Sequence, residues 1–272
     1  MSIVHRNLVS DSPLVQETIE LLRLCGGRAP VTQVADLVLN LPDPDPQFAA
    51  IVVSELIKDD GRLCLNNDGF IELLYDPLED SPLYETDFVV VDVETTGAKL
   101  ATSRITEIGA YRVSQGRIVA EFETLVNPQS IIPQYIVQLT GITNAMVRTA
   151  PVFGDIAADW LRFIDMAILV AHNAPFDMSF LNREVARVYP GRRMANLHLC
   201  TVTMSRRVLP GLPNYKLHTI AEHLRIPIRQ RHRAASDALA TAEIFLRMLE
   251  IFRINGVRSL AEARCFRVQT DG

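Results

Sequence analysis

One stretch, residues 87–97, constrains both the fold and the chemistry of this chain. It reads Asp-Phe-Val-Val-Val-Asp-Val-Glu-Thr-Thr-Gly, which predicts a buried β-strand followed by a tight turn. Because side chains alternate across a strand, Asp92 and Glu94 share one face with Phe88 and Val90. Two neighbouring carboxylates at a buried strand end repel each other, and a bound divalent cation relieves that repulsion. The alternative is that the strand end reaches solvent, where two acids cost little.

The composition is that of a globular protein with material for a sizeable core. The chain has 272 residues, 48% of them hydrophobic and 22% charged, which suggests one large or two ordinary domains. No apolar run approaches a membrane span of roughly 18 residues, and the first residues lack the apolar region of a signal peptide. The four cysteines form no Cys-x-x-Cys pair. We therefore expect a cytoplasmic protein with reduced thiols and no membrane association.

Charge is distributed unevenly along the chain. Residues 1–80 hold 5 Lys and Arg against 14 Asp and Glu, whereas the remainder holds 22 against 18. A polyanion such as a nucleic acid would be attracted to the second part and repelled by the first.

Residues 1–82 predict a small domain of their own. Three short helices, followed by a hairpin, are expected over 13–24, 31–39, 47–58 and around the turn Asn66-Asn-Asp-Gly69. This order of elements resembles a winged helix-turn-helix domain. The acids at the end of the third helix disfavour contact with phosphates, so we expect either a role in docking a protein partner or a structural, accessory role. Residues 76–87, which contain prolines and several acids, are expected to form a linker.

Residues 83–250 predict a mixed-sheet α/β domain. Two runs rich in Ile, Val and Thr follow the opening strand, and the three together indicate a meander. Beyond it, helices alternate with a short buried strand, over 152–164, 167–171, 175–188 and 234–250. This alternation is typical of a sheet flanked by helices. Residues 251–272 are expected to form a short C-terminal tail.

Three further polar residues lie where predicted elements begin. Asp177 ends the run His172-Asn-Ala-Pro-Phe-Asp at the start of a helix, where an acid also complements the helix dipole. Asp237 lies on the inward stripe of the last helix and needs a partner there, either a cation or a basic side chain. His232 precedes this helix in a loop, where it is either a surface residue or a group beside a metal site.

Taken in order, these patterns resemble the DEDDh family of 3′–5′ exonucleases, which includes the proofreading epsilon subunit of bacterial DNA polymerase III. The match runs from about residue 87 to residue 250, and flanking features agree with it at 105–110, 139–143 and 216–221. The resemblance implies a ribonuclease H-like mixed sheet flanked by helices.

The resemblance also implies the chemistry of the site. Two divalent cations, Mg²⁺ or Mn²⁺, would be held by Asp92, Glu94, Asp177 and Asp237. His232 would be the general base that takes a proton from the attacking water. The product would be 5′-mononucleotides, released from the 3′ end of DNA in repair or proofreading.

The implied partner is a single-stranded or frayed 3′ end of DNA. An enzyme that tolerates any sequence should hold the backbone and stack bases. The residues expected to contact it are Thr95, Thr96, Gly97, Tyr135, Leu139, Thr140, Asn173, Phe176, Arg231 and Arg233. The two arginines belong to a basic cluster with Arg225 and Arg229, for which the alternative is a solvated loop.

Two other functions are consistent with the same residues. One is an RNA-trimming exoribonuclease of the same family, which would differ only in its surroundings for the 2′-hydroxyl. The other is a DNA-binding regulator in which the first domain acts and the nuclease domain is vestigial. The presence of all five predicted catalytic positions disfavours the vestigial regulator, and the sequence does not distinguish DNA from RNA as the substrate.

Overall fold

The computed structural model describes residues 5–58, 60–74 and 82–268, which form two compact units. The first unit comprises Met1–Pro77 together with Tyr189–Ala195, and the second comprises Leu78–Val188 and Asn196–Gly272. The boundary lies near the expected one at residue 82, but the contribution of 189–195 to the first unit was not anticipated. Of the expected linker, residues 76–81 lie outside the described residues.

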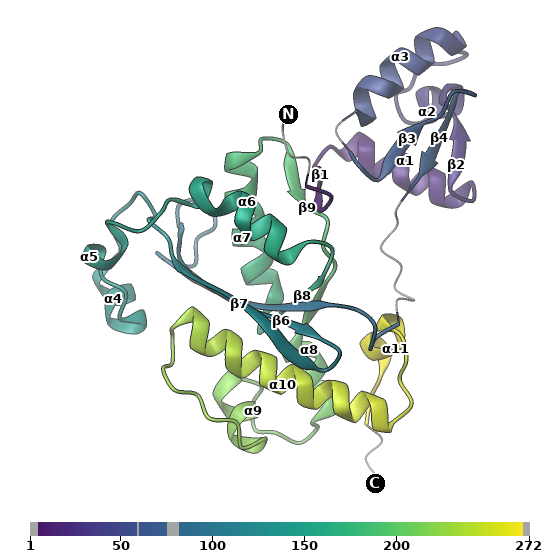
Figure 1. Ribbon diagram of the computed structural model, residues 1–272. Helices are drawn as coiled ribbons and strands as arrows, with labels where there is room; N and C mark the ends of the chain where they lie inside the picture. Colours follow the sequence, from purple (N-terminus) through teal and green to yellow (C-terminus); the bar gives the residue numbers. More distant parts are fainter. Residues whose placement is uncertain (1–4, 59, 75–81, 269–272) are drawn as a thin grey trace. The chain divides into compact units, whose positions relative to one another are not determined.

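The described residues of the first unit form three helices and a three-stranded antiparallel sheet (Figure 1). The helices are α1 (Pro13–Leu24), α2 (Val31–Leu37) and α3 (Pro46–Ile57), and the strands are β2 (Arg28–Pro30), β3 (Leu63–Leu65) and β4 (Phe70–Leu73). The strand order is β2-β4-β3. The predicted helices and hairpin are confirmed. Strand β2 was not predicted, because three residues are too few to show alternation.

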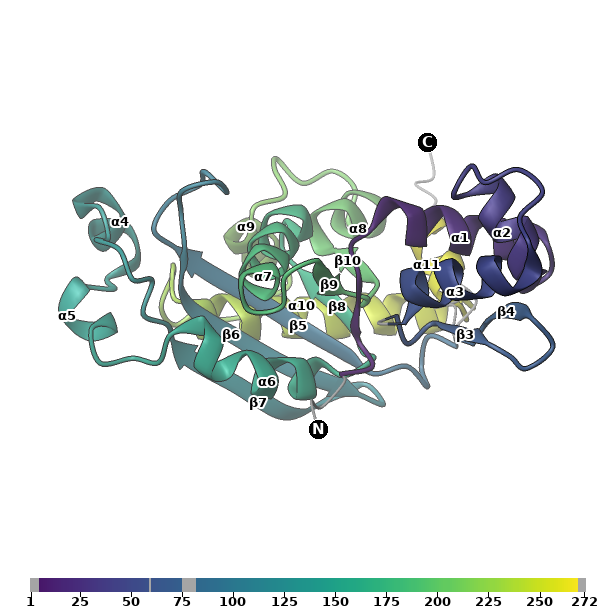
Figure 2. The same cartoon turned by 90° about the horizontal axis from the view of Figure 1, so that it is seen from above.

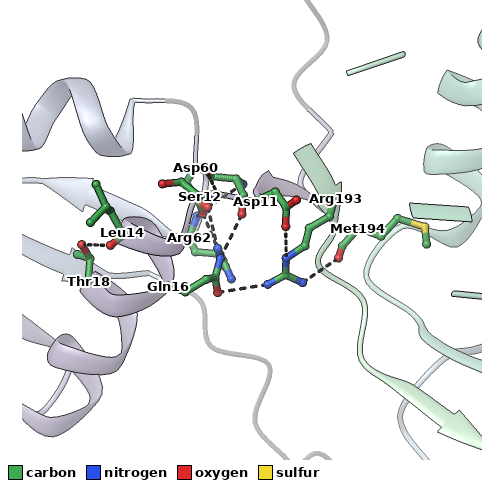
Figure 3. Close-up of polar contacts among 10 residues, drawn as sticks. Asp11, Ser12, Leu14, Gln16, Thr18, Asp60, Arg62, Arg193 and Met194 are labelled. Carbon is green, nitrogen blue, oxygen red and sulfur yellow. Dashed lines mark hydrogen bonds and ion pairs between the residues drawn. The ribbon is translucent and has the colours of Figure 1, made fainter. Parts of the chain in front are cut away.

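A second, two-stranded sheet in this unit joins distant parts of the chain. Strand β1 (Leu8–Ser10) pairs antiparallel with β9 (Arg192–Met194). The Arg193 guanidinium donates to Gln16 Oε1 at 3.2 Å and lies 3.7 Å from an oxygen of Asp11 (Figure 3). Residues 189–195 therefore belong structurally to the first unit although they lie between two elements of the second.

The second unit is built on a five-stranded mixed sheet. Its strands are β5 (Phe88–Thr95), β6 (Ile105–Ser114), β7 (Arg117–Leu125), β8 (Ile168–Ala171) and β10 (His198–Cys200). The order is β10-β8-β5-β6-β7, in which β5, β8 and β10 are parallel and the meander β5-β6-β7 is antiparallel. The predicted mixed sheet, with β5 at its centre, is confirmed.

Helices cover both faces of this sheet (Figures 1 and 2). On one face, α10 (Ala234–Ile254) packs against β5 and β6, with the rings of Phe245 and Phe88 4.8 Å apart. On the other face, α7 (Ala174–Val188) packs against β5, β6 and β8, and Trp160 of α6 (Phe153–Ile164) contacts Phe122 of β7. The remaining helices are α4 (Gln134–Thr140), α5 (Asn144–Val147), α8 (Thr201–Val208), α9 (Leu217–His223) and α11 (Leu260–Cys265).

The residues expected to form a C-terminal tail instead extend the core. Helix α10 continues to Ile254, and α11 follows with Leu260 and Ala263 buried in the same apolar cluster as Phe88. Helix α11 was not predicted because residues 251–272 are too short a segment to show a helical periodicity of apolar residues. Among the described residues, no helix is long and apolar enough to cross a membrane.

Candidate active site

Four carboxylates come together from three elements of the second unit. Asp92 and Glu94 lie on β5, Asp177 is in the first turn of α7, and Asp237 is in the first turn of α10. The alternation of β5 turns Asp92 and Glu94 toward the α10 face, where Phe88 and Val90 pack in the core. The predicted acids are thus gathered at the end of the central strand.

Asp177 is fixed by the backbone of β5. Only Phe88, Val89 and Val90 of β5 pair with β8, so the strand runs on beyond its neighbour. The N–H of Val93 donates to Asp177 Oδ1 at 3.2 Å, in the part of β5 that lies beyond its pairing with β8. Asp177 is 3% exposed, so its position is set by the strand rather than by solvent.

His232 joins this group from the loop that precedes α10. One ligand atom each from Glu94, His232 and Asp237 lies within 4.8 Å of the others. The backbone N–H of His232 donates to Asp237 Oδ2 at 2.9 Å, and His232 has a φ of 58°, in the left-handed region. A tight turn therefore brings the imidazole back over the carboxylates.

Electrostatics at the site favours a bound cation. Burial raises the pKa of Asp92 well above its ordinary value, and the nearby carboxylates of Asp177, Glu94 and Asp237 raise it further. Burial likewise raises the pKa values of Asp177 and Asp237. All these shifts mean that the charged carboxylates are costly in the protein alone. Oxygen ligands that repel one another in this way suit hard divalent cations such as Mg²⁺ or Mn²⁺.

The free energy of unfolding without divalent cations should fall as the pH rises. Burial, then Asp237 and Glu107, raise the pKa of Glu94 from 4.5 to about 8. Between these values the folded chain binds more protons than the unfolded chain, so stability is highest at the acidic end. We expect a lower melting temperature in EDTA at about pH 8 than at about pH 5.5. The variant Glu94→Gln should weaken this dependence, and a melting temperature that rises over the same range would contradict it.

A cleft of about 510 Å³ opens beside His232 and Asp237. Its other walls include Tyr215, Lys216 and His218. Of these, Lys216 and His218 belong to the flanking feature 216–221, whereas Tyr215 was not anticipated. His172 supports this wall, because its Nε2 lies 3.1 Å from the Tyr215 carbonyl oxygen and its Nδ1 lies 2.9 Å from Thr201 Oγ1. Burial lowers the pKa of His172 to about 4. A neutral imidazole facing a carbonyl oxygen donates from Nε2, so His172 holds the 215 loop in place.

Several residues expected to contact substrate are open to solvent. Tyr135 is 63% exposed and Leu139 is 51% exposed, both on α4. A Cβ placed on Gly97 would lie 3.3 Å from the Tyr135 hydroxyl oxygen, so α4 borders the turn that follows β5. Asn173 and Arg231 are also exposed, and Phe176 is half-buried against Phe180 with their rings 4.8 Å apart.

The three expected threonine hydroxyls have partners within the chain instead. Thr95 Oγ1 donates to the Gly97 carbonyl oxygen at 2.8 Å. Thr96 Oγ1 accepts from the Arg104 N–H at 3.0 Å. Thr140 Oγ1 donates to the Ile136 carbonyl oxygen at 3.0 Å and accepts from the N–H of Ile142. These side chains are buried and shape the turn after β5 and the end of α4, which a sequence motif cannot distinguish from contact with substrate.

Arg233 also differs from expectation. Its guanidinium binds the buried carboxylate of Glu107 on β6, with Nη2 2.6 Å from Oε1. Glu107, which is 4% exposed, was missed as a functional candidate. An acid within the apolar run 105–110 was the available signal, because a charged side chain on a buried strand needs a partner.

Known proteins resemble the second unit in sequence and in fold. The family described as Exonuclease matches residues 89–245. A PolC-type DNA polymerase III from Caldanaerobacter subterraneus is 43% identical over 178 residues, which are 65% of this chain and 13% of that protein. The DNA polymerase III subunit epsilon of Aquifex aeolicus is 40% identical over 168 residues, covering 62% of this chain and 83% of the relative.

Two solved structures show the same fold. A structure of exonuclease X in complex with 5′ overhanging duplex DNA has a TM-score of 0.51 and 27% identity, covering 65% of this chain and 97% of the other. E. coli exonuclease I in complex with a dT13 oligonucleotide has a TM-score of 0.54 and 17% identity, covering 63% and 42%. None of these matches covers the whole of this chain.

Proposed function

We propose that this chain, which belongs to the exonuclease family, hydrolyses DNA from the 3′ end and releases 5′-mononucleotides. The observation that carries the proposal is the convergence of the family's four acids and its histidine at the end of β5. The relatives support DNA as the substrate, because they are DNA polymerase III proteins and an exonuclease solved with DNA. A role in proofreading or repair follows from the same relatives.

The carboxylates and the histidine of the site have different roles in the reaction. Asp92, Glu94, Asp177 and Asp237 would hold two divalent cations, which when bound would supply Lewis-acid stabilisation of the attacking and leaving oxygens. His232 accepts the proton of the attacking water. The water oxygen bonds to the terminal phosphorus, and the bond from that phosphorus to the 3′ oxygen of the preceding nucleotide breaks. The shortened strand keeps that oxygen, which takes up a proton from solvent water to become the new 3′-hydroxyl, and a 5′-mononucleotide leaves.

The terminal nucleotide is held by the turn after β5 and by α4. The turn at 95–97 offers backbone groups, with its hydroxyls engaged inside the chain. Tyr135 and Leu139 present exposed apolar surface on which a base can stack. Arg231, exposed beside His232, is suited to a phosphate. These contacts read no base edge, which suits an enzyme that accepts any sequence.

The first unit has a separate, accessory role in this proposal. Its strand order β2-β4-β3 and its three helices support the winged-helix interpretation. Phe48 and Ile51 are exposed on α3, at 50% and 68%. An acidic unit with exposed apolar residues fits a protein partner better than DNA.

Parallel digestion of labelled substrates tests the proposed activity. With Mn²⁺ or Mg²⁺, we expect the full chain to shorten single-stranded DNA and mismatched duplex ends from the 3′ end, and EDTA to stop it. A short RNA of matched sequence shows whether the 2′-hydroxyl is tolerated. Faster trimming of RNA than of DNA would assign the chain to the RNA-trimming relatives, and intact substrates in every arm would refute nuclease activity.

The variant His232→Ala should retain metal binding but lose rate. Removing a general base costs about 10²–10⁴-fold in rate, and we expect a loss in this range with little change in KM. His223 at the end of α9 provides the control, because His223→Ala removes an imidazole outside the cleft. A His232→Ala enzyme with the original rate would show that another group takes the proton.

A further inference from the structure

A fifth carboxylate, Glu107, lies on the same sheet face as the four acids of the site. In the antiparallel pairing of β5 and β6, Glu107 is opposite Glu94 and Gly109 is opposite Asp92. Directly opposed residues of an antiparallel pair point to the same face. Glu107 is 4% exposed, so its charge is as well removed from water as that of Asp177. A buried carboxylate in this position needs a specific partner.

The partners of Glu107 are two consecutive residues at the start of α10. Arg233 Nε lies 3.1 Å from both carboxylate oxygens, and its Nη2 donates to Oε1 at 2.6 Å. The backbone N–H of Ala234, the first residue of α10, donates to Oε2 at 2.8 Å. Both oxygens are therefore occupied, and Glu107 holds the helix start rather than a cation. An acid at a helix N-terminus also complements the helix dipole.

The residue before this anchored pair is the proposed general base. Asp237 accepts from the N–H of His232 at 2.9 Å, and its own N–H donates to the Arg233 carbonyl oxygen at 3.0 Å. Two acids thus fix the successive residues 232–234. Glu107 on the sheet binds Arg233 and Ala234, and Asp237 on α10 binds the backbone of His232. Any movement of Arg233 and Ala234 is passed directly to His232 and, through the first turn of α10, to Asp237.

We propose that Glu107 is a positioning residue, which sets the places of His232 and Asp237 relative to Glu94 through its bonds to Arg233 and Ala234. This inference rests on the proposed function for its kinetic effect, but not for its structural effect. The role of Arg233 changes with it, from contact with phosphate to anchoring of α10.

The kinetic test compares full-length variants on single-stranded DNA with saturating Mn²⁺. Glu107→Gln keeps the shape of the side chain but loses the charge pair, and we expect kcat to fall about 10²-fold, because small misplacements of catalytic groups have effects of that size. KM should change little, since the 95–97 turn and α4 are untouched. Arg233→Gln should match this loss, Arg233→Lys should recover part of it, and the double variant should be no worse than either single one.

The structural test measures hydrogen exchange at the amides of residues 232–238. Loss of one charge-assisted bond at the helix start should raise exchange there about tenfold in Glu107→Gln. Asp60→Asn is the matched control, because Asp60 is also buried and binds an arginine, Arg62, through two oxygens in the other unit. It should leave exchange at 232–238 and kcat unchanged.

The outcomes separate this inference from the proposed function. Unchanged exchange and unchanged kcat in Glu107→Gln would overturn the positioning role while nuclease activity stands. An inactive parent chain would refute the function, and raised exchange in Glu107→Gln alone would still support the anchor. Equal losses of kcat in Glu107→Gln and Asp60→Asn would show a general effect of removing buried charge, and would also overturn it.

Discussion

Replacing Asp92 with asparagine should reduce nuclease activity to the level of a reaction without enzyme, while making the metal-free protein more stable. Asp92 lies at the centre of the carboxylate group, and burial and four neighbouring acids raise its pKa. An amide is a much weaker ligand for a hard cation, so the cations are lost. The substitution also removes a buried carboxylate that the neighbouring acids repel. The melting temperature in EDTA should therefore rise, by about 2–4 °C for each kcal/mol added to the free energy of unfolding.

The control for this prediction is the residue directly before the same strand. Asp87 binds Arg112 at 2.8 Å and is partly exposed, so Asp87→Asn makes the same chemical change away from the site. Activity of Asp87→Asn should be close to that of the parent. An active Asp92→Asn would disprove the metal-ligand assignment, and a lower melting temperature in EDTA would disprove the repulsion among the acids.

Substituting Gly109 with alanine should displace α10 and cost both stability and activity. A Cβ at this position would lie 2.3 Å from the backbone C of Ala234 and from the backbone N of Ala235. Backbone cannot yield as a flexible side chain can, so the helix start must move away from the sheet. Overpacking of a core typically costs about 1–3 kcal/mol. Because α10 carries Asp237, we expect an additional loss of about 10²-fold in rate.

A glycine without close neighbours controls for the loss of backbone freedom. Gly154 lies in the first turn of α6, and the nearest heavy atom to a Cβ there is Val188 Cγ2 at 3.9 Å. Gly154→Ala should be neutral or slightly stabilising, since alanine favours a helix. Thermal melts and single-turnover rates measure both effects. A Gly109→Ala chain that is as stable and active as Gly154→Ala would show that α10 does not need to pack this closely against β6.

The elements that carry the metal ligands could be predicted from the sequence because each has a strong local pattern. Strand β5 is a long apolar run that ends at Asp92 and Glu94, and α10 has a sustained apolar stripe that includes Asp237. Asp177 lies just inside α7, where proline and the motif residues mark the helix start. The local patterns thus placed each acid on its strand or helix, and only the resemblance to the family indicated that the four acids form one site.

What the sequence did not reveal depends on pairings between distant residues. Glu107 and its partner Arg233 are 126 positions apart, and neither position shows by itself that the other binds it. Strand β9 is too short for alternation, and its partner β1 is far away in the sequence, since Val9 pairs with Arg193. The hydrogen bond from the Thr140 hydroxyl to the Ile136 carbonyl oxygen was not anticipated for a related reason, because a motif gives residue types but not the direction of a side chain.

The most direct test of the cation site is the binding of Mn²⁺ followed by electron paramagnetic resonance. Four carboxylates around two cations predict two bound Mn²⁺ per chain, about 3.5–4 Å apart and therefore spin-coupled, and predict that Asp92→Asn abolishes the coupled signal. A chain that degrades DNA while it binds no Mn²⁺, or that binds two ions without coupling, would contradict the proposed site.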